Sequence, residues 1–158
     1  MGVSGVGKST IGRELASRLG WPFHDADHLH SPDNIARMRS GRPLDDESRL
    51  PWLLAVRDLI ARVSSEERNA VVACSALRAS YRALLLDGVP DVRVVFLTAP
   101  ADVLRSRVAM REGHFMPAAL VDSQLATLEP PAGAVTIDAT RPLEDVVSRI
   151  VGEVGLAP

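Results

Sequence analysis

The chain has 158 residues, which predicts one domain with a hydrophobic core of its own. Its 18 lysines and arginines against 20 aspartates and glutamates give a formal net charge of −2, so the balance favours no nucleic-acid partner. A single cysteine excludes an internal disulfide framework, and no apolar run approaches the ~20 residues of a membrane span. We therefore expect a cytoplasmic protein without membrane association.

The chain opens with a phosphate-binding loop. Residues 2–9 read GVSGVGKS and match all four fixed positions of the G-x-x-x-x-G-K-[ST] motif. Backbone N–H groups of such a loop, together with the positive end of the following helix, cradle phosphate oxygens. Lys8 is expected to reach the β- and γ-phosphates as a catalytic residue, and Ser9 to ligate Mg²⁺. The predicted ATP-binding residues are Gly2, Val3, Ser4, Gly5, Val6, Gly7, Lys8, Ser9 and Thr10.

Beyond the loop, apolar periodicity and turn residues predict helices that alternate with short strands. Strands are expected over residues 22–24, 70–73, 92–97 and 135–138. Helices are expected from the loop to Gly20, from Ser31 to near Gly41, and over 46–63, 78–86, 100–110, 118–128 and 142–154, with a loop at 112–117. Such alternation is typical of an α/β fold with a parallel sheet.

Six blocks spread over most of the chain resemble the small phosphate-loop gluconokinases, which are relatives of shikimate and adenylate kinases. The blocks are GVSGVGKST at 2–10, DADHLH at 25–30, MRSGRPLDDESRLPWL at 38–53, ACSALRASYR at 73–82, REGHF at 111–115 and DSQLATLEPP at 122–131. The resemblance implies an α/β P-loop kinase three-layer sandwich, a parallel sheet flanked by helices, as a single domain over 1–158 with a lid around 105–117. It also implies ATP-dependent phosphorylation of D-gluconate to 6-phospho-D-gluconate, and a homodimer as in many members of the family.

One strand of that fold is missing from the sequence. A phosphate loop normally hangs from a central buried strand, and here only Met1 precedes Gly2. Because a central strand buries several apolar side chains, a monomer without it is expected to be marginally stable. The hypothesis is that Met1 is the last residue of this strand and that the start is internal. The alternative is a four-stranded protein in which the gap is filled in another way.

Two aspartates follow the first predicted strand, where a parallel sheet presents its ligands. Phosphoryl transfer to an alcohol needs one carboxylate to accept the hydroxyl proton and another to manage Mg²⁺. The resemblance assigns Asp27 to the sugar acid and to the role of base, and Asp25 to the metal; for Asp25 a turn or cap residue is the less favoured alternative. His30 is assigned to substrate, whereas His28 is expected at the surface.

Three arginines are candidates for binding the substrate carboxylate. Arg49 precedes Pro51–Trp52, and its planar guanidinium suits a carboxylate bidentately. Arg78 and Arg82 lie four residues apart, where like charges repel unless an anion lies between them, although a solvated surface is the alternative. Motif position favours Arg49 and Arg82 over Arg78.

The C-terminal half adds groups for closure and for adenine. The resemblance places Arg107 and Arg111 as catalytic lid arginines over the transferred phosphoryl group, with Arg105 solvated. His114, Phe115 and Gln124 are implied to approach the substrate. Arg141 is implied to stack on adenine, beside Thr140 as the cap of the last helix.

Two other functions remain open from the sequence. One is a kinase for a different polyol acid such as shikimate, against which the PWL and SALRASYR blocks argue. The other is a nucleotide-binding module without kinase activity.

Overall fold

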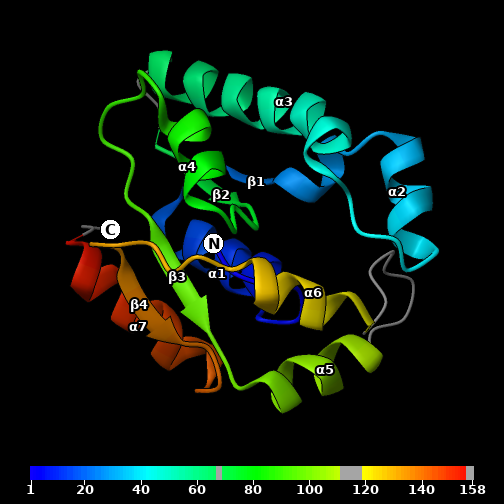
Figure 1. The fold of residues 1–158 in the computed structure, drawn as a ribbon. Coiled ribbons are helices and arrows are strands. Elements are labelled where there is room, and N and C mark those ends of the chain that lie inside the picture. Colours follow the sequence, from blue (N-terminus) through cyan, green and yellow to red (C-terminus); the bar gives the residue numbers. More distant parts are fainter. Residues whose placement is uncertain (67–68, 111–118, 156–158) are drawn as a thin grey trace.

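Helices and strands alternate along the chain in the order that the periodicity predicts. The computed structural model describes residues 1–66, 69–110 and 119–155 (Figure 1). The elements are α1 (Lys8–Leu19), β1 (Phe23–Asp25), the 3-10 helix η1 (Ala26–Leu29), α2 (Pro32–Arg39), α3 (Asp46–Ser65), β2 (Val71–Ala73), α4 (Ala79–Leu86), β3 (Val95–Thr98), α5 (Ala101–Ala109), α6 (Ala119–Thr127), β4 (Val135–Asp138) and α7 (Leu143–Val154).

The four strands form two parallel pairs. β1 pairs with β2, with Phe23 opposite Val71, and β3 pairs with β4, with Val95 opposite Val135. The first two residues lie between the pairs: the backbone N–H of Leu97 donates to the carbonyl of Met1 over 2.9 Å, and the N–H of Gly2 donates to the carbonyl of Ser75 over 3.3 Å. These contacts bridge the two pairs where the expected central strand would lie. The hypothesis about the start of the chain stays a prediction.

Two groups of helices enclose the strands (Figure 1). α1 and α7 share one hydrophobic core with β3, β4 and the phosphate loop, in which Val6, Ile137 and Val147 are fully buried. α3 and α4 pack on each other around a second core that contains Trp52, Val56 and the buried free Cys74. The three-layer α/β arrangement of a P-loop kinase is therefore present. None of the described helices combines the length and the apolarity that crossing a bilayer demands.

Side-chain caps explain the starts of α2 and α3. Ser31 caps α2, where its hydroxyl accepts from the N–H of Asn34, and Asp45 caps α3, where its carboxylate accepts from the N–H of Ser48. The prediction that Thr140 caps the last helix is wrong, because Pro142 holds that position. The hydroxyl of Thr140 instead donates to the carboxylate of Asp138 over 2.7 Å, within the turn that leaves β4.

One strand begins later than expected. Residues 92–97 were predicted from their apolar run, but β3 starts at Val95. Asp91 adopts a φ of 59°, so the turn after α4 is still in progress there, and Val92 remains exposed. The exposed Val92 therefore belongs to the connection and not to the buried strand.

Candidate active site

The phosphate loop is held in its curve by close packing beneath it. Val3 and Val6 are buried in the core, at 3% and 0% exposed. A Cβ at Gly5 would lie 2.8 Å from the carbonyl oxygen of Leu104, so only glycine allows the loop to sit this close to α5. Gly7 adopts a φ of 100° as the residue that caps α1. The backbone of the loop therefore leads directly into the N-terminus of α1, which is the arrangement of a phosphate-binding site.

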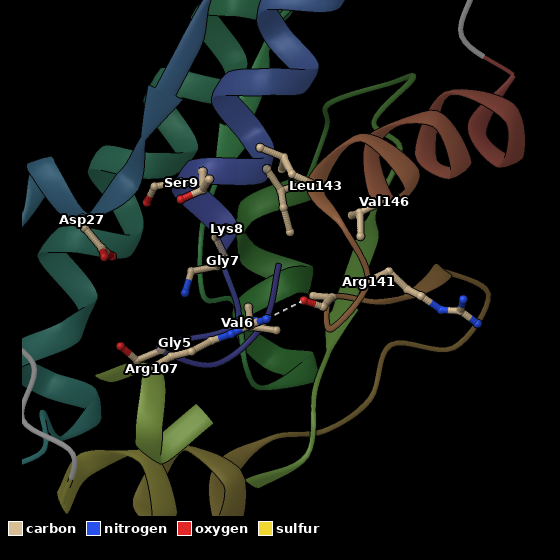
Figure 2. A pocket seen from close by; sticks show the side chains of 14 residues that line it. Gly5, Val6, Gly7, Lys8, Ser9, Asp27, Arg107, Arg141, Leu143 and Val146 are labelled. Atoms are coloured by element: carbon tan, nitrogen blue, oxygen red, sulfur yellow. Dashed lines mark hydrogen bonds between the residues drawn. The ribbon is translucent and has the colours of Figure 1, made fainter. Parts of the chain in front are cut away.

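The loop borders a cavity of about 370 Å³ (Figure 2). Seven consecutive loop and helix residues, 4–10, line it, so most of the predicted nucleotide residues lie together, whereas Gly2 and Val3 are not among the described lining residues. The other lining residues are Ile11, Asp27, Arg107, Ala139, Arg141, Leu143 and Val146.

The predicted metal residues meet at one edge of this cavity. The hydroxyl of Ser9 donates to Oδ2 of Asp25 over 2.6 Å, and Oδ1 of Asp25 accepts from the backbone N–H of Asp27 over 3.1 Å. A hydroxyl and a carboxylate are oxygen ligands of the kind that Mg²⁺ takes, with waters and phosphates completing its shell. Within the described residues there is no group of three His, Cys, Asp or Glu that could hold a metal by itself. The pair therefore fits a magnesium ion that is shared with a nucleotide.

A second cavity, of about 250 Å³, adjoins the first. Ser4, Lys8 and Asp27 line both, so the phosphate loop and one carboxylate stand where the two cavities meet. In Figure 2 the side chain of Asp27 points from η1 toward the space in front of the loop. The Nζ of Lys8 donates to the carbonyl of Val3 over 3.1 Å and so lies close against the loop.

Besides the three shared residues, polar side chains from α3, α4 and α6 and from the segments after η1 and β2 line the second cavity, which we call the acceptor pocket. They include most of the residues that the sequence assigns to substrate. The lining residues besides the shared three are His30, Met38, Pro43, Leu44, Arg49, Trp52, Ser75, Leu77, Arg78, Tyr81, Leu120, Ser123, Gln124 and Thr127.

Gln124 and His30 are each held by a specific contact, the first with the phosphate loop and the second with another residue of the pocket. Oε1 of Gln124 accepts from the backbone N–H of Ser4 over 2.7 Å, so α6 is tied to the phosphate loop. His30 stacks on Trp52 with ring centroids 4.5 Å apart and planes 9° apart. Burial lowers the pKa of His30 to about 4, with the charge of Asp27 opposing and that of Arg49 adding to the effect, so its imidazole is neutral at physiological pH.

The three arginines predicted to bind a carboxylate do not all lie in the same place. Arg49 and Arg78 line the acceptor pocket, and Arg78 pairs with Asp46 over 2.9 Å. Arg82 is absent from the described lining of both cavities. Its guanidinium donates to the carbonyls of Ala76 and Leu77 over 2.9 and 3.1 Å, which holds the turn after β2.

The remaining predicted residues lie at the nucleotide side or outside the described part. Arg107 donates to the carbonyl of Ala139 over 3.0 Å across the nucleotide cavity (Figure 2). Arg141 is exposed and extends away from the loop. Arg105 pairs with Asp122 over 2.7 Å, and His28 is exposed as expected. Arg111, His114 and Phe115, with most of the expected lid, lie outside the described residues.

Sequence reasoning missed several lining residues. Ser123 and Thr127 lie four residues apart on α6, beside Gln124, and this polar stripe on a short helix was the available signal. Asp46, which is not among the described lining residues but contacts two of them, was also missed, although it begins α3 within the RPLDDESR block.

Comparisons with known proteins agree with this geometry. The family described as an AAA domain matches residues 1–131. A gluconokinase of Gluconobacter oxydans is 46% identical over 83% of this chain and 74% of its own. The crystal structure of a gluconokinase from Sinorhizobium meliloti is 42% identical, with a TM-score of 0.86 over 98% of this chain and 89% of that one. An unliganded sugar kinase from a Janibacter species is also 42% identical, with a TM-score of 0.91 over 100% of this chain and 93% of that one. Two cavities that meet at a phosphate loop, on a chain this similar to gluconokinases over most of its length, place the protein in the gluconokinase family.

Proposed function

We propose that the chain transfers the γ-phosphoryl group of ATP to the terminal hydroxyl of D-gluconate and releases 6-phospho-D-gluconate and ADP. The observation that carries this proposal is the meeting of the two cavities at Ser4, Lys8 and Asp27. A phosphoryl donor on one side and an alcohol on the other would then share the same few groups, which is the proximity that transfer requires. The gluconokinase relatives support gluconate as the acceptor.

The acceptor pocket has the chemistry of a sugar-acid site. The guanidiniums of Arg49 and Arg78 suit a carboxylate, while Gln124, Ser123 and Thr127 offer partners for a row of hydroxyls. One face is apolar, because the ring of Trp52 lines it. A flexible polyol with one acidic end is the ligand class that fits these groups best.

Proton and charge movements fall to residues at the junction. Asp27 accepts the proton of the attacking hydroxyl as its oxygen bonds to the γ-phosphorus and the bond to the leaving ADP oxygen breaks. Lys8 and Arg107 neutralise charge on the phosphoryl oxygens. Mg²⁺, for which Ser9 and Asp25 are the proposed ligands, supplies further charge neutralisation when bound. The magnesium requirement, the homodimer, the cytoplasmic location, and the roles of Arg141 and of the lid stay predictions.

A coupled ADP-release assay across sugar acids tests the proposal. We expect turnover with gluconate and little with shikimate; equal rates would favour the broader kinase, and no turnover with bound ATP would favour the nucleotide-binding module.

Asp27→Asn should lower kcat about 10²–10⁴-fold with little change in ATP affinity, because it removes the proton acceptor. Asp33→Asn, at an exposed position in the first turn of α2, is the matched control and should keep the wild-type kcat. An unchanged kcat in Asp27→Asn would remove Asp27 as the base.

A further inference from the structure

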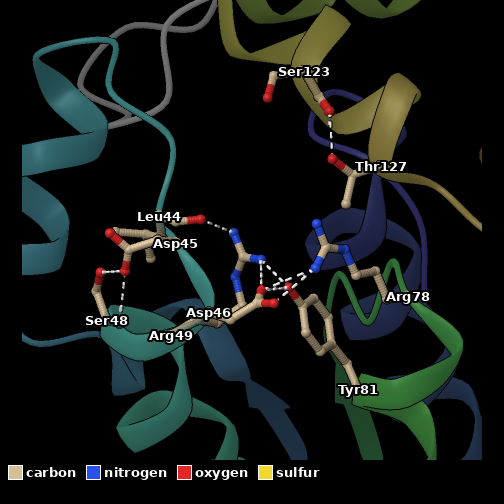
Figure 3. Close-up of polar contacts among 9 residues, drawn as sticks. All are labelled: Leu44, Asp45, Asp46, Ser48, Arg49, Arg78, Tyr81, Ser123 and Thr127. Carbon is tan, nitrogen blue, oxygen red and sulfur yellow. Dashed lines mark hydrogen bonds and ion pairs between the residues drawn. The ribbon is translucent and has the colours of Figure 1, made fainter.

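A closed polar network joins the two arginines of the acceptor pocket through a residue outside that pocket (Figure 3). The hydroxyl of Tyr81 accepts from a terminal nitrogen of Arg49 over 2.5 Å and donates to Oδ1 of Asp46 over 2.5 Å. One terminal nitrogen of Arg78 donates to both carboxylate oxygens of Asp46, over 3.0 and 2.9 Å. The tyrosine hydroxyl therefore has a fixed proton direction, from the arginine side toward the carboxylate.

The two guanidiniums also flank one aromatic ring. The Cζ of Arg49 lies 5.1 Å and the Cζ of Arg78 lies 5.5 Å from the centroid of Tyr81. Two cations gathered around one ring repel each other. Asp46 contacts Arg78 directly and lies 4.0 Å from the nearest nitrogen of Arg49, so its charge offsets that repulsion. Two guanidiniums and one carboxylate leave a single net positive charge.

Asp46 itself stands back from the substrate. Its side chain is 67% exposed, whereas that of Arg49 is 20% exposed, and Asp46 is not among the described residues that line the acceptor pocket. Hydrogen bonding from Tyr81, and then the charges of the two arginines, lower the pKa of Asp46, so it remains a carboxylate at neutral pH. Any effect of Asp46 on a ligand in the pocket would therefore pass through Arg78 and Tyr81.

We propose that Asp46 is a positioning and specificity residue, which holds Arg49 and Arg78 around Tyr81 as a receptor of net charge +1 for a singly charged sugar acid. This inference rests on the proposed function, since it concerns how the acidic end of the acceptor is recognised. The electrostatic energy between a ligand and a fixed charge of the protein is proportional to the charge of the ligand. Asp46 therefore disfavours a doubly charged acid more than a singly charged one.

The test compares Asp46→Asn with Asp45→Asn, which removes the same charge one residue earlier. Asp45 caps α3 and pairs with Arg37 over 3.1 Å, away from the network, and asparagine is an equally good cap. The measurements are kcat and KM for gluconate, and the competitive Ki of D-glucarate, which carries a carboxylate at each end. Wild-type protein should bind gluconate in preference to glucarate.

For Asp46→Asn we expect KM for gluconate to rise severalfold, with kcat within about threefold of wild type. The reason is that the hydrogen bonds to Asp46 from Arg78 and from Tyr81, whose hydroxyl also holds Arg49, lose their charge assistance. The ratio of Ki for glucarate to KM for gluconate should fall severalfold, which a purely structural role would not produce. Asp46→Glu should restore that ratio, and Asp45→Asn should match wild type.

Each other outcome overturns a stated claim. An unchanged KM in Asp46→Asn, or a raised KM with an unchanged ratio, would overturn the assignment of Asp46. If Asp46→Asn does not fold, Tyr81→Phe breaks the same network while it keeps the ring, and wild-type KM in that variant would overturn the assignment equally. Absence of gluconate turnover in the wild-type protein would instead overturn the proposed function, and this inference with it.

Discussion

The indole N–H of Trp52 links the second core to η1, the 3-10 helix that carries Asp27, and its removal should lower both thermal stability and the rate of turnover. Nε1 of Trp52 donates to the carbonyl of Ala26 over 2.7 Å, and both residues are buried, at 3% and 0% exposed. Phenylalanine keeps an aromatic ring that can stack on His30 but removes the N–H. The buried carbonyl then loses its partner, which costs about 1–3 kcal/mol. For a chain of this size, each kcal/mol lowers Tm by about 2–4 °C.

We therefore expect Trp52→Phe to lower Tm by about 2–12 °C in a thermal melt followed by circular dichroism. Because Ala26 directly precedes Asp27 in η1, kcat for gluconate should fall as well, while ATP binding should persist. Trp21→Phe makes the same chemical change at the other tryptophan, which packs half-buried against the first core, and serves as the control. A Tm for Trp52→Phe within 1 °C of wild type would refute the role given to this hydrogen bond.

Three further predictions concern the phosphate loop, the hydrogen bond between Gln124 and that loop, and the half-buried His30. Gly5→Ala should weaken ATP binding more than tenfold in a calorimetric titration, because its Cβ would meet the carbonyl of Leu104. The control is Gly20→Ala, at a φ of 66° with open space around it, which should bind ATP normally. Equal ATP affinities in the two variants would contradict the steric argument. Gln124→Met should weaken ATP binding about tenfold, since the buried N–H of Ser4 loses its acceptor. Gln124→Glu keeps that acceptor and should chiefly raise KM for gluconate. The same ATP affinity and the same KM in the two variants would argue against a role for this hydrogen bond. Burial lowers the pKa of His30 to about 4 in the folded state, against about 6.5 in the unfolded chain. Between these pH values the unfolded chain binds more protons, so the free energy of unfolding falls as pH drops from about 6.5 to 4. In urea titrations at pH 4.5 and 7.5, His30→Asn should lose part of that difference, and an undiminished difference would count against the assignment.

Local patterns in the sequence predicted what depends on local chemistry. The loop motif, the cap at Ser31 and the periodicity of α3 each concern one uninterrupted segment of the chain, and each agrees with the structure. The role assigned to Arg82 shows the limit of such patterns. Spacing placed it on one helical face with Arg78, but Arg78 precedes the helix as its extended cap residue, so the four-residue rule does not join them.

Contacts between distant segments could not be derived from spacing. The bridge from Met1 to Leu97 spans most of the chain, and so does the bond from Gln124 to Ser4. No periodicity in either segment encodes its partner. The resemblance to a family did indicate that Gln124 belongs to the site, but not that its oxygen holds the phosphate loop.

The blocks that carry the resemblance share a physical role that their residue types alone do not reveal. Trp52 holds the residue before Asp27, and Gln124 holds a residue of the loop. Each side chain comes from a different helix, and each bonds to backbone beside a group of the site. The backbone at these points lies in a loop at Ser4 and at the first residue of a four-residue 3-10 helix at Ala26, so little regular structure fixes its position.

Glu129 completes this pattern at the acceptor pocket. Its carboxylate accepts from the N–H of Ala79 over 2.6 Å, and its own N–H donates to the carbonyl of Leu77 over 2.9 Å. Arg78 lies between those two residues and provides no side-chain cap to α4, so Glu129 caps that helix from the segment after α6. A substitution at Glu129 would therefore act on Arg78 without touching substrate. In the blocks that carry the resemblance, one segment therefore supplies the reactive or binding group, and a distant segment fixes the backbone beside that group.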